Sequence, residues 1–256
     1  MTTWRLRNAF LAIPAVPITA LAVLAAQVLR ATRRPDLPTF PNQDPSGRFG
    51  EGALPHLRIV ALGDSSITAP GVADLDNIWI RRIARTLSDR YQVELISLAV
   101  GGSKAGDVVE GQLSEAVRLH PDVAVVSVGA NDALRGVTPE RYRRHLTTIV
   151  HRLSATGAGV LVFGMGDLGS IPRLPPSLRR WATRRSATFD RVARQVVVGV
   201  PTAVKVYTRG RSSAAFFEDP GLFAGDLFHA GDDGHAIFAA DAMEAVEAAI
   251  ALRHMA

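Results

Sequence analysis

The sequence has no cysteine, and lysine occurs only at Lys104 and Lys205. The absence of cysteine excludes a disulfide framework, a thiolate nucleophile and a cysteine-ligated zinc site. Without cysteine, the sequence gives no indication of a reducing or an oxidising compartment, so it does not specify on which side of a membrane the protein lies. The P-loop pattern, which ends in Gly-Lys followed by Ser or Thr, does not occur, and this absence excludes that phosphate-binding loop. No internal repeat is present.

The basic residues are almost all arginine. The 256 residues carry 29 Lys and Arg against 24 Asp and Glu, and 47% of them are hydrophobic. A chain of this size and composition buries a large core and fits one α/β domain with an appendage. Arginine suits phosphate, but these arginines are scattered and no nucleic-acid-binding module accompanies them. We therefore expect no nucleic-acid partner.

The N-terminus carries the longest apolar run. Residues 9–29 contain no charge and are flanked by Arg5 and Arg7 on one side and by Arg30 and Arg33 on the other. As a helix this stretch would rise roughly 30 Å, the thickness of the hydrocarbon core of a bilayer. We expect residues 1–34 to form a hydrophobic helix that anchors the protein in the cell envelope, with the rest facing outward. The alternative is a cleaved signal peptide, which would release a secreted protein.

The next segment differs in composition from both its neighbours. Residues 35–56 are rich in Pro, Gly and polar residues and show neither the helical nor the strand period. Such a composition is typical of a partly extended tether. We therefore predict a linker over 35–56 and a folded domain over 57–256.

Within 57–256, apolar runs alternate with segments of helical spacing. The runs are short, rich in β-branched residues and nearly continuous, as expected of strands covered on both faces. They begin at Leu57, Val93, Val123, Gly159 and Thr202. The helical segments cover residues 77–90, 107–119, 138–155, 178–200 and 233–253. This alternation predicts an α/β fold with a doubly wound parallel sheet and right-handed crossovers.

Polar residues follow the strands where each is expected to end. The clusters are Gly63–Ser66, Gly101–Ser103 and Gly129–Asp132, with Gly225–His229 before the last helix. Ligands bind beyond the carboxyl ends of the strands in such sheets. A serine hydroxyl becomes a nucleophile when an imidazole takes its proton and a carboxylate orients that imidazole. Turn amides and an asparagine amide are suited to stabilising the oxyanion that forms.

The order of these clusters resembles the SGNH, or GDSL-type, hydrolases. The four residues that name the family are matched by Ser65, Gly102, Asn131 and His229, within a span from about Leu57 to Leu252. The resemblance implies a flavodoxin-like, three-layer fold and a serine hydrolase of esters.

The same resemblance assigns roles to the site residues. It implies Ser65 as nucleophile, His229 as general base and acid, and Asp226 as the residue that orients His229. The backbone amides of Ser65 and Gly102 and the side chain of Asn131 would form the oxyanion hole.

Other residues compete for some of these roles. Ser66 is an alternative nucleophile on chemistry alone, and only the family pattern selects Ser65. Gly101 remains an alternative oxyanion donor. Ser103 imitates the Gly-x-Ser-x-Gly elbow of α/β-hydrolases, but alanine stands in place of the last glycine.

Two further features of the sequence suggest a metal site and a lipid-binding surface. His235 follows Asp232 and Asp233, a run that could suggest a metal site, although carboxylates at a helix start more often cap amides and complement the dipole. Residues 178–200 are rich in arginine, and this segment is either a lipid-facing surface or an ordinary solvated helix face.

The loop 165–176 is expected to form a wall of the substrate site.

We therefore predict an enzyme that hydrolyses lipid or short-chain carboxylic esters through an acyl-enzyme and needs neither metal nor organic cofactor. Its partners would be the ester substrate and, through residues 1–34, the membrane. One alternative is a carbohydrate or peptidoglycan O-acetylesterase. Another is a non-catalytic envelope protein that keeps the fold as a binding scaffold. The sequence specifies no oligomeric state.

Overall fold

The computed structural model describes Ala26 and residues 34–255. The chain divides into two compact units, Met1–Asp36 and Leu37–Ala256. In the first, Arg34 and Asp36 form an ion pair of 2.7 Å. The predicted hydrophobic helix lies outside the described residues, apart from Ala26 and Arg34. Among the residues that are described, no helix combines the length and the apolar character needed to cross a bilayer.

A six-stranded sheet forms the centre of the second unit, with the order β1-β3-β2-β4-β5-β6. The strands are β1 (Gly47–Phe49), β2 (His56–Gly63), β3 (Gln92–Ser97), β4 (Val123–Ser127), β5 (Gly159–Val162) and β6 (Ala203–Lys205). Strands β2 to β6 are parallel, and each coincides with a run predicted from the sequence. Counted along the chain, their order is 2-1-3-4-5, which is the flavodoxin-like order with a switch point between β2 and β4.

The sheet is mixed, which corrects the prediction of a wholly parallel sheet. Strand β1 pairs antiparallel with β3, with Arg48 opposite Glu94 and Phe49 opposite Val93. An ion pair of 3.1 Å joins Arg48 to Glu94, and Arg81 lies over the Phe49 ring at 4.9 Å. Three residues on a sheet edge are too few to show a strand period, so the sequence did not reveal this strand.

The segment predicted as a tether also contacts the domain ahead of β1. The Asn42 Oδ1 accepts a hydrogen bond of 2.7 Å from the Thr68 hydroxyl. The Gln43 amide donates to the Thr68 carbonyl at 2.7 Å, and the Gln43 side chain donates to the carbonyls of Ala69 and Val72 at 3.0 and 2.8 Å. Residues 42–43 therefore brace the turn that leaves β2.

The described part of the chain contains nine α-helices. They are α2 (Ser65–Thr68), α3 (Trp79–Leu87), α4 (Ala105–Gly111), α5 (Leu113–Arg118), α6 (Ala130–Leu134), α7 (Pro139–Ser154), α8 (Pro176–Val198), α9 (Arg211–Glu218) and α10 (Asp232–Leu252). Thr138 caps α7 by accepting from the Arg141 amide at 3.2 Å, and Pro139 occupies the first helical position, where its missing N–H costs no hydrogen bond. The helix predicted over 107–119 is divided at Gln112 into α4 and α5.

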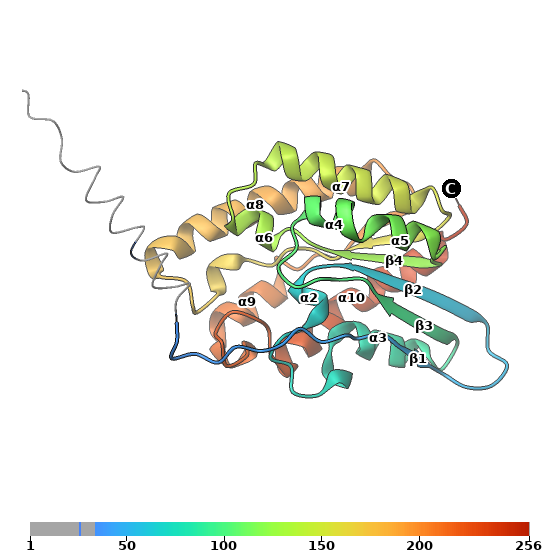
Figure 1. Ribbon diagram of the computed structural model, residues 1–256, viewed down its shortest axis with the longest axis horizontal. Coiled ribbons are helices and arrows are strands. Elements are labelled where there is room, and N and C mark those ends of the chain that lie inside the picture. The colour runs from blue at the N-terminus through green and yellow to red at the C-terminus, as the bar shows by residue number, and fades with distance from the viewer. Residues whose placement is uncertain (1–25, 27–33, 256) are drawn as a thin grey trace, which may run out of the picture. The chain divides into compact units, whose positions relative to one another are not determined.

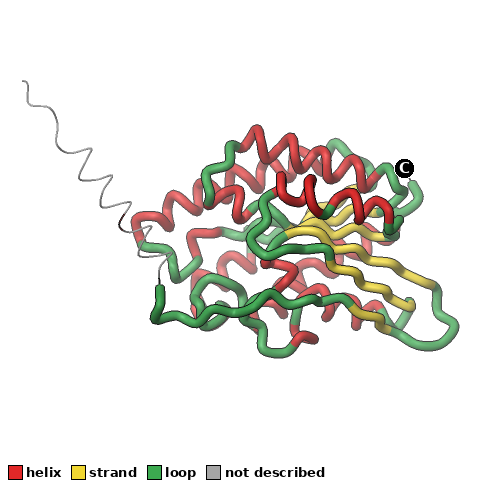
Figure 2. The backbone as a smooth tube through the Cα atoms, viewed as in Figure 1, coloured by secondary structure: helices red, strands yellow, loops and turns green. Residues whose placement is uncertain are grey.

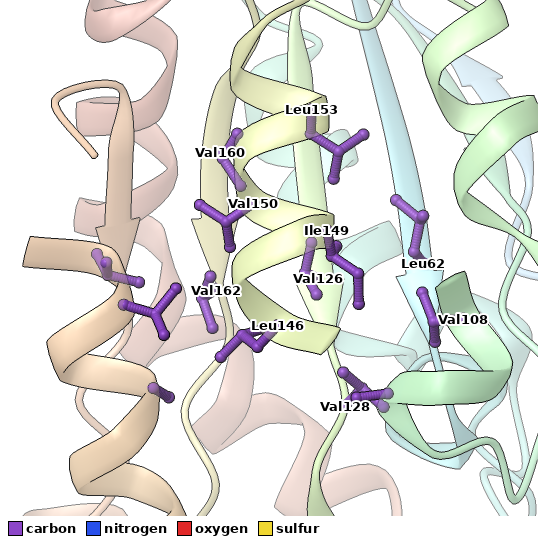
Figure 3. Close-up of a cluster of buried hydrophobic side chains, with 14 of the residues drawn as sticks. Leu62, Val108, Val126, Val128, Leu146, Ile149, Val150, Leu153, Val160 and Val162 are labelled. Atoms are coloured by element: carbon purple, nitrogen blue, oxygen red, sulfur yellow. The ribbon is translucent and has the colours of Figure 1, made fainter. Parts of the chain in front are cut away.

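The helices form a layer on each face of the sheet (Figures 1 and 2). Helices α4, α5, α7 and α8 cover one face, where Leu62, Val126 and Val162 point into a buried cluster with Leu146 and Ile149 of α7 (Figure 3). Helices α3 and α10 cover the other face through the alternate strand residues. A strand buried on both faces needs apolar residues at every position, which explains the continuous runs. The two layers leave the carboxyl ends of the strands for polar turns.

Candidate active site

The turn after β2 is held close to β4. Gly63 has a φ of +147°, and a Cβ added there would lie 1.9 Å from the carbonyl oxygen of Ser127. Only glycine fits this approach and this backbone conformation. The chain then enters α2, whose N-cap Asp64 accepts a hydrogen bond of 3.0 Å from the Ser66 amide. Ser65 is thereby placed at the switch point of the sheet.

The two serines of this turn have different surroundings. The Ser66 hydroxyl lies 2.8 Å from Asp64 Oδ1 and 2.5 Å from the Ser127 hydroxyl, so it ties the turn to β4. The Ser65 hydroxyl has no hydrogen-bond partner among the described residues, and Ser65 lines a cavity. Of the two, Ser65 is free to attack a bound carbonyl.

Asp226 and His229 form a hydrogen-bonded pair, and His229 lines the same cavity as Ser65. His229 Nδ1 lies 2.6 Å from Asp226 Oδ2. Because a carboxylate only accepts, this contact places the proton on Nδ1 and leaves the Nε2 lone pair as the base. The turn between them holds Leu227 at a φ of +58°, in the left-handed region that non-glycine residues rarely adopt. No hydrogen bond joins Ser65 to His229 in this structure.

The Asp226 carboxylate is buried and stays ionised. Burial opposes its ionisation, but hydrogen bonds from the His229 side chain and from the amides of His229 and Phe228 outweigh it and lower the pKa of Asp226 below its ordinary value. The two amides donate to Oδ1 at 3.0 and 2.9 Å. One carboxylate oxygen thus fixes the turn while the other orients the imidazole.

Three groups were predicted for an oxyanion hole. The Ser65 and Gly102 amides have no hydrogen-bond partner among the residues described. Gly102 has a φ of +82°, and a Cβ there would lie in ordinary contact with the Arg135 guanidinium at 3.6 Å, whereas a Cβ on Gly101 would lie 2.0 Å from Asn42 Oδ1. Gly102 is therefore the less obstructed of the two glycines. Unlike Ser65 and His229, neither Gly102 nor Asn131 lines the cavity.

The Asn131 amide nitrogen is engaged in this structure. It donates to Asp64 Oδ2 at 3.3 Å and to the Ser103 carbonyl at 3.2 Å. Both bonds are long, so a developing oxyanion would compete well with either acceptor. Burial raises the pKa of Asp64, against the hydrogen bonds that it accepts from Ser66 and Asn131.

Gln112 is a supporting residue that the sequence analysis missed. Its side chain accepts from the Gly63 amide at 2.8 Å and donates to the Gly63 carbonyl at 3.0 Å, which fixes the end of β2. It also donates to the Ser103 hydroxyl at 3.3 Å, so Ser103 takes part in this buried network. The sequence does mark Gln112 in one way. It is a polar residue on an apolar helix stripe, four positions after Val108 and four before Ala116.

The cavity beside Ser65 has a volume of about 170 Å³ and is mostly apolar. The loop after β5 forms one wall, as predicted for residues 165–176, through Met165–Leu168, Ser170 and Ile171. Five phenylalanines complete the apolar lining: Phe163, Phe216, Phe223, Phe228 and Phe238. No lysine or arginine lines the cavity within the described chain.

Asp232 and His235 make different contacts in the structure. Asp232, in the first turn of α10, accepts from the Ala73 amide at 3.1 Å and from the Asn77 side chain at 2.6 Å, so it also ties down the loop before α3. His235 Nδ1 accepts from the Trp79 amide at 3.2 Å. Across residues 34–255 and Ala26, no group of three or more acidic or histidine side chains is arranged to hold a metal ion.

Comparison with known proteins gives concordant results. The model of the GDSL-like lipase/acylhydrolase family matches residues 61–237. A GDSL-like esterase of Mycobacterium tuberculosis is 32% identical over 190 residues, which cover 72% of this chain and 59% of that protein. The esterase TesA of Pseudomonas aeruginosa is 27% identical over 151 residues, or 57% of this chain and 68% of that protein. The chain therefore spans about three-fifths of the length of the mycobacterial relative.

Solved structures show the same fold. An acetylxylan esterase from Geobacillus stearothermophilus superposes with a TM-score of 0.59 at 19% sequence identity, over 75% of this chain and 94% of the other. All five predicted site residues fall inside the segment that the family model matches.

Proposed function

We propose that this chain, which belongs to the GDSL-like lipase/acylhydrolase family, is a serine esterase that hydrolyses carboxylic esters through an acyl-enzyme. The observation that carries the proposal is the shared cavity of Ser65 and His229. The Ser65 hydroxyl is free, and the imidazole is held in one tautomer by the buried, ionised Asp226.

The reaction proceeds in two half-reactions. Ser65 Oγ attacks the ester carbonyl while His229 Nε2 takes its proton, and the tetrahedral intermediate collapses when His229 returns that proton to the leaving alcohol. Water then attacks the acyl-enzyme by the same route, with His229 again as base and then as acid. The products are a carboxylic acid and an alcohol, with Ser65 regenerated. Asp226 stabilises the transient imidazolium without taking its proton.

The amides of Ser65 and Gly102 and the side chain of Asn131 stabilise the oxyanion in this scheme. Each is positioned by a different strand end: β2, β3 and β4 respectively. The Ser65 and Gly102 amides are unpaired donors fixed in place before the reaction, so they need no reorganisation when charge develops. Asn131 exchanges a long bond to Asp64 or Ser103 for one to the oxyanion.

An uncharged, largely apolar acyl group fits the cavity. Its lining is dominated by aromatic and aliphatic side chains, and it holds no cation that would pair with an acidic acyl chain. A longer hydrocarbon acyl chain buries more apolar surface against this lining than an acetyl group does, which favours lipid or short-chain carboxylic esters over a carbohydrate or peptidoglycan O-acetyl group. The likeness to an acetylxylan esterase, at 19% identity, concerns the fold and carries no weight for the substrate.

Labelling with a fluorophosphonate probe tests the proposal directly. Such a probe modifies only an activated serine, so the wild-type protein should carry one adduct, located on Ser65 by peptide mass spectrometry. The Ser66→Ala variant is the matched control and should still be labelled. An adduct on Ser66 or Ser103 would contradict the assignment, and no adduct at all would favour the non-catalytic scaffold.

Replacement of Asn131 by alanine is expected to lower kcat by about 10² to 10³-fold with a small change in KM. The reason is the loss of one oxyanion donor, which acts only once charge develops on the carbonyl oxygen. Steady-state kinetics with a chromogenic ester measures the effect, and thermal unfolding separates it from the loss of the bonds to Asp64 and Ser103. An unchanged kcat would remove Asn131 from the mechanism.

The apolar run over residues 9–29 supports a second part of the proposal, which concerns location. We propose that residues 1–34 anchor the esterase in the cell envelope with the catalytic domain facing outward. N-terminal sequencing of the mature protein decides between this anchor and a cleaved signal peptide, because cleavage would remove the apolar run.

A further inference from the structure

His235 is a second histidine beside the cavity, and the catalytic scheme does not use it. It lies in the first turns of α10 and is 2% exposed. Its Nδ1 accepts a hydrogen bond of 3.2 Å from the amide of Trp79, the first residue of α3. The N-cap of that helix, Ile78, supplies no side-chain acceptor, so His235 satisfies one of the amides that a helix start leaves without a partner.

This contact fixes the state of the ring. An amide only donates, so Nδ1 carries a lone pair and the proton of a neutral imidazole lies on Nε2. Burial lowers the pKa of His235 to about 3, which keeps the ring neutral throughout the physiological range. His235 therefore presents a fixed N–H donor at Nε2 and no charge.

That donor faces the cavity. In the described part of the chain, Nε2 has no hydrogen-bond partner, yet it is not among the polar atoms sealed from solvent, and His235 is part of the cavity lining. The imidazole ring packs edge-on against the Phe238 ring, with 5.5 Å between the ring centroids. The Phe238 centroid lies 5.4 Å from that of Phe163 and 5.3 Å from that of Phe216. The cavity thus combines an aromatic wall with the neutral donor of His235. Five serine hydroxyls that also line it are already hydrogen-bonded within the protein, and the Thr208 hydroxyl oxygen is sealed from solvent; these serines are Ser66, Ser127, Ser170, Ser212 and Ser213.

A fixed polar group in a mostly apolar pocket orients a ligand and contributes to its selection. An N–H left without an acceptor inside such a pocket carries a desolvation cost, which an acceptor atom on the ligand removes. Asp64 and Asp167 also line the cavity and no lysine or arginine of the described residues does, so an uncharged acceptor is favoured over an anion.

We propose that His235 is a substrate-binding residue whose Nε2–H donates to an uncharged oxygen, such as an ether or hydroxyl, on the acyl group of the ester. The inference rests on the proposed esterase function. The acyl group is the part of the substrate concerned, because it stays bonded to Ser65 through both half-reactions and needs an enclosed pocket in each, whereas the alcohol must leave. Oxygen-bearing acyl groups are therefore preferred over all-carbon groups of the same size.

Two substitutions separate the two functions of the ring. His235→Asn keeps an acceptor near the position of Nδ1 for the Trp79 amide and removes the donor at Nε2. His235→Gln places an amide N–H near the position of Nε2 and removes the Nδ1 acceptor. We expect the asparagine variant to lose selectivity and the glutamine variant to keep most of it while losing thermal stability.

The readout is the ratio of kcat/KM for esters that share a 4-nitrophenolate leaving group. One ester carries a pentanoyl chain, and the others place an ether oxygen at one of two positions, as 3-methoxypropanoyl or ethoxyacetyl. Each ratio is then divided by the ratio of the rate constants for alkaline hydrolysis of the same two esters, which corrects for the difference in their intrinsic reactivity. Wild type should prefer at least one ether ester, and His235→Asn should reduce that preference by about 3- to 10-fold, as expected of one neutral hydrogen bond.

Three results would overturn the inference. One is equal corrected ratios in wild type, which needs no variant to fold. Another is an unchanged preference for the ether ester in His235→Asn, which would show that His235 caps α3 and does not contact the substrate. If wild type hydrolyses none of the esters, the proposed function fails with it, whereas hydrolysis without ether preference leaves the esterase proposal intact.

Discussion

The Ser65→Ala variant is expected to lose about 10⁵ to 10⁶-fold in kcat, the effect of removing the nucleophile from a serine hydrolase. The substitution removes an atom that has no hydrogen-bond partner in the described chain, so nothing else is disturbed. The free energy of unfolding should therefore change little. The measurement is steady-state hydrolysis of a 4-nitrophenyl ester, with thermal unfolding on the same preparations.

Ser66→Ala provides the matched control, because it removes the neighbouring hydroxyl in the same short helix. The hydroxyl of Ser66 contacts both Asp64 and Ser127. Its loss should cost about 1 to 3 kcal/mol of stability by leaving buried partners unpaired, while most of the activity remains. The opposite pattern, with Ser66→Ala inactive and Ser65→Ala active, would show that the wrong serine has been assigned.

The Asp226→Asn variant is expected to lose about 10⁴-fold in kcat. The asparagine oxygen would keep the hydrogen bonds from the amides of Phe228 and His229, so the turn should persist. Its NH₂ group would then face His229 Nδ1 as a second donor. The imidazole would have to present its lone pair there, which moves the proton to Nε2 and abolishes the base that Ser65 requires.

The pH dependence offers an independent check on Asp226. Its pKa lies below the ordinary value of 3.8, so the carboxylate is charged at every pH above about 4. An acid limb in the wild-type profile of kcat/KM above that pH should therefore not belong to Asp226. If Asp226→Asn retained activity within tenfold of wild type, Asp226 would not be the residue that orients His229.

The five parallel strands were predictable because a strand covered on both faces must be apolar throughout. Strand β1 was not, since three edge residues carry no period. Helices α2 and α6 are too short to show a helical pattern and are set by Asp64 and Gly129 at their starts. Propensity and periodicity report only on local sequence, so elements defined by one turn or one edge pairing escape them.

The site was predictable as a set of strand ends but not as a set of contacts. The sequence could not choose between Ser65 and Ser66 on chemistry alone, because the choice depends on Ser127, which lies on another strand. The bonds of Gln112 to Gly63 and of His235 to Trp79 likewise join residues far apart in the chain. Their functions follow from the packing of one layer against the next.

The bonds made by Asn42 and Gln43 bear on proteolysis. A protease that cuts ahead of Leu37 would release a domain whose nucleophile turn keeps all its outer hydrogen bonds. A cut between Gln43 and β2 would leave the Thr68 hydroxyl and the carbonyls of Thr68, Ala69 and Val72 without these partners. If residues 1–34 anchor the protein as proposed, the cut that sheds an intact domain and the cut that weakens its nucleophile turn are separated by only a short stretch of chain.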